Sequence, residues 1–116
     1  ENPELLNQAK ADLTFIKNIE ITSSWKNNLE IMSEGSHKGK AIEYLSGLLG
    51  IDRENIIAFG DNYNDLSMIE FAGTGVAMGN AEEEVKRIAN HVTSTNEDSG
   101  VAKAINSLVF QKVVSA

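Results

Sequence analysis

The sequence has 116 residues, of which 41% are hydrophobic, and this is enough for one small domain with a core of its own. The formal net charge of -7 excludes a surface built to bind nucleic acid or an anionic membrane, because both surfaces need clustered Lys and Arg side chains. The sequence contains no Cys, which excludes disulfides and a Cys nucleophile and is compatible with the cytoplasmic location that we expect.

The first part of the chain is expected to form a small unit of its own. Glu4 to Asp12 predicts a polar helix, and the alternation of apolar and polar side chains over Phe15 to Thr22 predicts a half-exposed strand. Leu29 to Met32 is a second strand that can pair with the first in antiparallel fashion. The polar stretch between these strands marks a domain boundary, which we place between residues 1–28 and 29–116.

A helix is predicted next, because five apolar residues recur at helical spacing. Ser36 is expected to be its N-cap, and Gly50 lies where a left-handed C-cap belongs. The apolar residues of this helix are Ala41, Ile42, Leu45, Leu48 and Leu49.

Short strands and helices then alternate to the end of the chain. The expected strands cover residues 56–59, 74–78 and 91–93, and the expected helices cover residues 65–71, 81–89 and 101–109. Because each strand is followed by a helix, this pattern predicts an α/β fold with parallel strands, flanking helices and right-handed crossovers.

The first of these strands ends in an acidic loop, Gly60-Asp61-Asn62-Tyr63-Asn64-Asp65. Ligands collect at the carboxyl ends of parallel strands, and Asp61 and Asp65 offer the hard oxygen atoms that Mg²⁺ prefers. A simpler interpretation is that the two Asp residues only cap the following helix. That interpretation does not explain why two Asp and two Asn occur within five residues.

Two other site types fail on spacing. A calcium-binding EF-hand that starts at Asp61 would need Gly at its sixth position and Glu at its twelfth, where this chain has Leu66 and Ala72. A phosphate-binding P-loop that starts at Gly35 would need a Gly-Lys pair followed by Ser or Thr, and the chain has Lys40-Ala41 there instead.

Lys38 lies at the start of the helix that contains Ala41 to Leu49, where a cation is unfavourable for the helix dipole. This placement indicates a functional use, although a single Lys is more often an ordinary surface residue. His37 and His91 are expected to be ordinary surface or strand-edge residues, because neither has a carboxylate or a second His at metal-ligand spacing.

Four segments together resemble a known family, the haloacid dehalogenase (HAD) superfamily, and more narrowly its Cof-type, sugar-phosphatase branch (class IIB). The segments are Leu29 to Gly39, Gly60 to Ile69, Ala72 to Ala81 and Thr95 to Ala102. The resemblance implies that residues 29–116 are the C-terminal half of a Rossmann-like core, and that residues 1–28 are the tail of an α+β cap domain.

The resemblance also implies roles for individual residues. Asp61 would bind Mg²⁺ directly, and Asp65 would hold the water shell of the metal or orient the loop. Lys38 and Asn64 would bind the phosphoryl group that is transferred. The substrate would be a sugar phosphate or a similar small phosphorylated metabolite, with nucleotide or cofactor phosphates as the alternative.

One part of the family's pattern is missing. Family members attack the phosphate with the first Asp of an Asp-x-Asp motif, whereas none of the five Asp residues here forms such a motif; they are residues 12, 52, 61, 65 and 98. We therefore expect a fragment of a Mg²⁺-dependent phosphatase that works through an aspartyl-phosphate, with this chain inactive alone. The alternative is a non-catalytic binding or regulatory module. Dimerisation through an exposed sheet edge is also expected.

Overall fold

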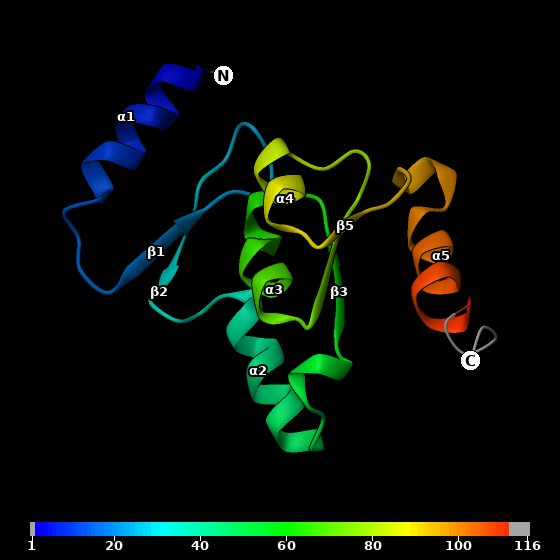
Figure 1. The fold of residues 1–116 in the computed structure, drawn as a ribbon. Coiled ribbons are helices and arrows are strands. Elements are labelled where there is room, and N and C mark those ends of the chain that lie inside the picture. The colour runs from blue at the N-terminus through cyan, green and yellow to red at the C-terminus, as the bar shows by residue number, and fades with distance from the viewer. Residues whose placement is uncertain (1, 112–116) are drawn as a thin grey trace.

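The computed structural model describes residues 2–111, and it confirms the α/β fold class. An N-terminal unit precedes a parallel sheet with flanking helices (Figure 1). The N-terminal unit contains α1 (Pro3–Leu13), β1 (Ile19–Thr22) and β2 (Glu30–Ser33). The remaining elements are α2 (Lys38–Leu49), β3 (Ile57–Gly60), α3 (Leu66–Phe71), β4 (Thr74–Ala77), α4 (Glu83–Ile88), β5 (His91–Val92) and α5 (Gly100–Ile105), which continues as a π-helical turn (Asn106–Phe110).

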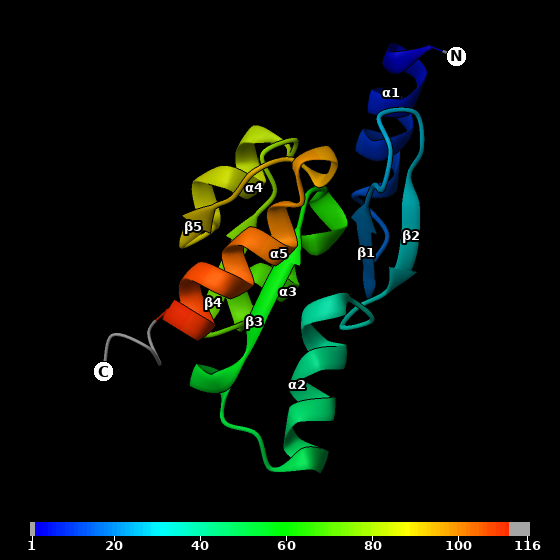
Figure 2. The ribbon, with the colours of Figure 1, turned by 90° about the vertical axis from the view of Figure 1, so that its right-hand side faces the viewer.

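The strands β3, β4 and β5 lie in sequence order in one parallel sheet. The sheet is covered by α3 and α4 on one face and by α5 on the other (Figures 1 and 2). Both crossover helices therefore lie on the same face, as two successive connections of the same hand require. Within residues 2–111, β3 pairs only with β4, so its other edge is open.

The N-terminal unit is a helix followed by a hairpin. β1 and β2 pair in antiparallel fashion from Ile19 opposite Ser33 to Thr22 opposite Glu30, so the expected pairing is confirmed. The strand expected from Phe15 begins only at Ile19, because the chain turns after α1 and Asn18 has a φ of 64°. The hairpin pairs residues on both sides of the boundary that we expected between residues 28 and 29. Residues 112–116 of the expected core domain lie outside the described residues.

The core lies between the parallel sheet and α3 and α4. Ile69 of α3 and Val85 of α4 are fully buried, and Gly75 of β4 lets α3 approach closely, since a Cβ there would lie 2.5 Å from the carbonyl oxygen of Ile69. The buried cluster consists of Ile69, Ala77, Met78, Ala81 and Val85, with Phe59, Leu66, Ile88 and Ala89 packed against it. This cluster packs α3 and α4 against β4 and the residues that follow it.

The predicted limits of α2 are confirmed at its C-terminal end and wrong in one detail at its start. Gly50 has the left-handed conformation, with a φ of 67°. His37 rather than Ser36 is the N-cap, because its Nδ1 accepts a hydrogen bond from the Lys40 N–H at 3.1 Å. Several large side chains of α2 are more than half exposed; these are Tyr44, Leu45, Leu48 and Leu49.

The molecule is elongated, with extents of 54 × 33 × 18 Å. Its radius of gyration of 16.3 Å exceeds the roughly 13 Å of a compact chain of about this length. The N-terminal unit and α2 both contribute to this difference, because they extend beyond opposite ends of the sheet (Figure 2). No helix in the described part of the chain is long and apolar enough to cross a membrane.

Candidate active site

The carboxylate of Asp65 closes the loop that follows β3. Its Oδ2 accepts hydrogen bonds from the backbone N–H groups of Asp61, at 3.0 Å, and Asn62, at 3.2 Å. Gly60 leaves room for the Asp65 side chain to fold back against the end of β3, because a Cβ on Gly60 would lie 2.5 Å from the Cβ of Asp65. Asp65 forms a capping box with Asn62 at the start of the turn Tyr63–Asp65 that leads into α3, and because its Oδ1 also binds Lys38, it does more than cap that helix.

Lys38 supplies the second interaction of the same carboxylate. Its Nζ lies 2.5 Å from Asp65 Oδ1. Asp65 is only 5% exposed, whereas the side chain of Lys38 is about half exposed. The carboxylate offsets the unfavourable position of a cation at the start of α2. Both oxygen atoms of Asp65 are therefore bound by the protein itself.

The charge state of Asp65 follows from these contacts. Burial raises the pKa of this carboxyl, but the hydrogen bond from Lys38, the two backbone N–H donors and the charge of Lys38 together outweigh it. The net result is a pKa below the ordinary value of 3.8. Asp65 is thus an anion at neutral pH and acts as a fixed acceptor.

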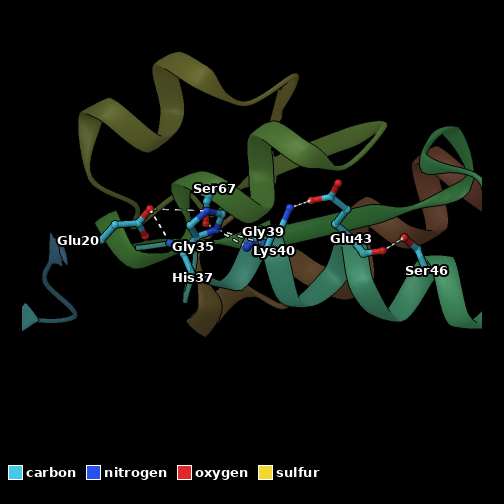
Figure 3. A network of polar contacts seen from close by, with 8 residues as sticks. All are labelled: Glu20, Gly35, His37, Gly39, Lys40, Glu43, Ser46 and Ser67. Carbon is cyan, nitrogen blue, oxygen red and sulfur yellow. Dashed lines mark hydrogen bonds and ion pairs between the residues drawn. The ribbon is translucent and has the colours of Figure 1, made fainter. Parts of the chain in front are cut away.

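Close packing of α2 against α3 brings Lys38 to this position. The N–H of Gly39 donates to Ser67 Oγ at 3.0 Å, a contact that Figure 3 shows between the start of α2 and α3. A Cβ on Gly39 would lie 2.5 Å from the carbonyl oxygen of Ser67. The Lys-Gly pair therefore combines a cation with the small residue that allows the cation to reach the loop.

Asp61 lies where the connections after three strands meet. Its backbone oxygen accepts from the Glu82 N–H at 2.9 Å, and its Oδ2 lies 3.4 Å from Asn80 Nδ2. Asn80 Oδ1 in turn accepts from the Asn96 N–H at 3.0 Å. The segments after β3, β4 and β5 are thus tied together beside the Asp61 carboxylate.

The Asp61 carboxylate borders an open hollow of about 500 Å³. One wall is formed by Asp61, Asn62, Asn80 and Glu82 at the carboxyl edge of the sheet. The other wall comes from the turn between β1 and β2, which reaches over the same end of the sheet (Figures 1 and 2). The hollow places a carboxylate next to space that a small molecule can enter.

Of the two carboxylates of this loop, that of Asp61 has more lone pairs free for a Mg²⁺ ion. Within residues 2–111, the weak contact at 3.4 Å to Asn80 is the one hydrogen bond made by the Asp61 carboxylate, so it keeps lone pairs for a metal, while both oxygens of Asp65 are engaged. In the same residues, no three His, Cys, Asp or Glu side chains form a metal-binding group. Mg²⁺ is commonly held by one or two carboxylates, with waters and substrate phosphate completing its shell.

Asn64 and His37 border a neighbouring hollow of about 390 Å³. The structure therefore brings Lys38, Asp61 and Asp65 together at one loop, while Asn64 lines the space beside it. His37 also lies 3.9 Å from Glu20 of β1, whose carboxylate accepts from the Gly35 N–H at 3.3 Å (Figure 3). These contacts join the hairpin to the start of α2, a role for His37 that the sequence did not indicate.

Known proteins share the sequence pattern of this chain, and one family model covers most of it. The family model described as haloacid dehalogenase-like hydrolase matches residues 1–105. The chain belongs to the haloacid dehalogenase-like hydrolases. The resemblance inferred from the four segments is thereby confirmed.

Three relatives show the range of this HAD-like family. A 5-amino-6-(5-phospho-D-ribitylamino)uracil phosphatase of Bacillus subtilis is 42% identical over 95% of this chain and 44% of its own length. A pyridoxal phosphate phosphatase of Escherichia coli is 45% identical over 77% of this chain and 33% of its own length. The solved structure of a HAD subclass IIB sugar phosphatase superimposes with a TM-score of 0.83 and 34% identity, over 89% of this chain and 40% of that one. The chain spans less than half the length of each.

Two residues of this HAD-like site were not predicted individually. Asn80 touches the Asp61 carboxylate, and Glu82 binds the Asp61 backbone. A signal for Asn80 was present, because it follows β4 almost directly and the carboxyl ends of neighbouring parallel strands lie side by side. No comparable signal marks Glu82, since its contribution comes from a backbone N–H.

The lowered pKa of Asp65 predicts an acid-sensitive contribution to stability. Because the folded-state pKa lies below the ordinary value of 3.8, the contribution is fully present above that value and is lost as pH falls through the folded-state pKa. Urea unfolding of the wild type and Asp65→Asn at a series of pH values checks this. The difference in unfolding free energy between the two should shrink in this acidic window, and a difference that stays constant with pH would contradict the assignment.

Proposed function

We propose that this chain supplies the metal-binding and phosphate-binding part of a Mg²⁺-dependent phosphomonoester hydrolase. The observation that carries the proposal is that Asp61 lines a ligand-sized hollow and belongs to the same loop as Asp65, which binds Lys38. The substrates in the names of two relatives are small phosphorylated compounds, and a third relative is a sugar phosphatase. The proposed substrate is accordingly a sugar phosphate or another small phosphorylated metabolite.

Each site residue has a role in this proposal. Asp61 holds the metal, which when bound neutralises negative charge on the phosphoryl group. Asp65 positions the loop and fixes Lys38 through the 2.5 Å contact. The remaining N–H donors of the Lys38 ammonium group, together with the amide of Asn64, bind phosphoryl oxygens.

The nucleophile of the proposed reaction is an aspartate that this sequence does not contain in the required motif. Its carboxylate oxygen forms a bond to phosphorus while the bond to the ester oxygen breaks, and the departing alkoxide takes a proton from an acid. Water then attacks the phosphorus of the aspartyl-phosphate, which releases phosphate and restores the aspartate. The relatives' greater length leaves room for that residue.

We assign residues 1–28 to the tail of a cap domain and residues 29–116 to the C-terminal half of the catalytic core. The net charge of -7 supports a small-molecule partner rather than nucleic acid or a membrane, and the absence of Cys supports a cytoplasmic location. The open edge of β3 supports dimerisation.

Metal and phosphate titrations of the 116-residue chain test the proposal. We expect Mg²⁺ to bind only in the roughly millimolar range, because the expected carboxylate ligands are only Asp61 and Asp65 and Asp65 already accepts three hydrogen bonds from the protein. Inorganic phosphate should bind only when Mg²⁺ is present, and Asp61→Ala should abolish this binding. The control is Asp52→Ala, at an exposed position, which should leave the binding unchanged. Phosphorus NMR measures the binding of phosphate, and calorimetry measures the binding of Mg²⁺.

Turnover is the second readout. We expect the chain alone not to hydrolyse 4-nitrophenyl phosphate, since it lacks the nucleophile. Turnover that Asp61→Ala abolishes would contradict the assignment of the nucleophile to another segment. Phosphate binding that is unchanged in Asp61→Ala would contradict the proposed function as a whole.

A further inference from the structure

The hollow beside Asp61 has a second wall for which the proposed chemistry has no use. This wall consists of Ser24, Trp25, Lys26 and Asn27, from the turn between β1 and β2. The volume of about 500 Å³ falls within the range of roughly 300 to 1,000 Å³ that is typical of sites for small molecules. A phosphate group alone would fill only part of it.

The turn is held in shape by Asn28. Its Oδ1 accepts hydrogen bonds from the backbone N–H groups of Ser24, at 3.2 Å, and Trp25, at 3.0 Å. Its Nδ2 donates to Ser24 Oγ at 3.0 Å. These three bonds order the backbone that carries Trp25 and Lys26, so a ligand that binds there meets a preorganised surface.

Trp25 is 72% exposed on this ordered turn. An indole in that position offers a flat apolar face, on which planar rings stack whatever their substituents. Lys26 beside it adds a flexible cation that can donate hydrogen bonds to carbonyl or hydroxyl oxygens. The opposite wall, with Asp61, Asn62 and Asn80, offers carboxylate and amide groups instead.

We propose that Trp25 is a specificity residue that favours phosphomonoesters whose leaving group carries a planar ring. The inference rests on the proposed function, because that function puts the phosphate at Asp61. The remainder of the molecule then extends across the hollow, and its ring stacks on Trp25 while Lys26 contacts polar substituents of the ring.

A matched pair of ligands tests this. Uridine 5′-monophosphate and ribose 5-phosphate share the sugar and the phosphate and differ in the planar base. NMR titration of the chain with Mg²⁺ should give uridine 5′-monophosphate a roughly tenfold higher affinity, as expected for one stacked base. Trp25 is the one Trp of the sequence, so its fluorescence should also be quenched by uridine 5′-monophosphate and not by ribose 5-phosphate.

Three variants complete the test. Trp25→Ala should make the two affinities equal, and Trp25→Phe should keep most of the difference because it keeps a ring. Phe15→Ala is the matched control, since Phe15 is an aromatic side chain with 88% exposure that lies outside this hollow. It should leave the difference unchanged.

The outcomes separate this inference from the proposed function. If the wild-type chain binds both ligands equally or binds neither, or if Trp25→Ala keeps the difference, the role of Trp25 is overturned. In those cases the Mg²⁺-dependent binding of inorganic phosphate still reports on Asp61 by itself. If that binding does not depend on Asp61, the proposed function fails as well.

Discussion

Gly39→Ala is expected to lower the free energy of unfolding by about 2 to 3 kcal/mol, although Ala usually favours a helix over Gly. The added Cβ would lie 2.5 Å from the carbonyl oxygen of Ser67. That atom belongs to the backbone of α3, so the clash can be relieved only if α2 and α3 separate. Urea denaturation monitored by circular dichroism measures the loss.

The same substitution at Gly47 is the control for this prediction. Gly47 lies in the same helix, but a Cβ there has nothing within 4 Å. Gly47→Ala should therefore stabilise the chain by about 0.5 to 1 kcal/mol through helix propensity alone. If both substitutions had the same sign, the close approach of α2 to α3 would not be what requires Gly39.

Separation of the two helices should also reach the candidate active site. Lys38 precedes Gly39, so any shift of α2 lengthens the 2.5 Å contact between Lys38 and Asp65. In Gly39→Ala the pKa of Asp65 should move up toward its ordinary value, which NMR titration of the carboxyl carbon can follow. Gly47→Ala should leave that pKa where it is.

Asp65→Ala is expected to lower the free energy of unfolding by about 2 to 3 kcal/mol. The substitution removes the acceptor of two backbone N–H groups, those of Asp61 and Asn62, and the partner of Lys38. Part-buried donors without an acceptor are expensive, and Asp65→Ala leaves the loop after β3 with the hydrogen bonds of Asn62 to the Asp65 backbone N–H but without those of the carboxylate. Thermal or urea unfolding detects the loss.

Two comparisons divide that loss into its parts. Lys38→Met removes only the cation, and because Lys38 is about half exposed we expect a loss of about 1 kcal/mol or less. Asp52→Ala, at an exposed carboxylate, should change stability by less than about 0.5 kcal/mol. A loss in Lys38→Met as large as that in Asp65→Ala would mean that the ion pair, and not the loop hydrogen bonds, is the main contribution.

The features that could be predicted from the sequence depend on neighbours along the chain. The strand that ends at Gly60, the helix that Gly50 caps and the parallel alternation all follow from local pattern and turn chemistry. The N-cap of α2 was wrong by one residue, because Ser36 and His37 both have a side chain that can accept a hydrogen bond. Only the backbone geometry distinguishes them.

The features that could not be predicted depend on contacts between distant segments. Lys38 and Asp65 are 27 residues apart, and no periodicity connects them. The turn that carries Trp25 reaches the carboxyl edge of the sheet only because the hairpin is joined to α2 at the angle that the structure shows. The sequence suggested both Asp61 and Asp65 as metal ligands, but it did not show that the Asp65 carboxylate accepts three hydrogen bonds from the protein whereas that of Asp61 accepts one.

The open edge of β3 has a direction, and this limits what it can assemble. Strands related by a two-fold axis run antiparallel, so two copies of this chain joined at that edge would carry their Asp61 loops to opposite ends of the shared sheet. Such a dimer would cover the edge without adding any group to either hollow. A strand of different sequence that pairs with β3 in parallel would instead bring its own last residue beside Asp61. Antiparallel pairing at this edge can therefore only join two copies, whereas parallel pairing can add a residue to the candidate active site.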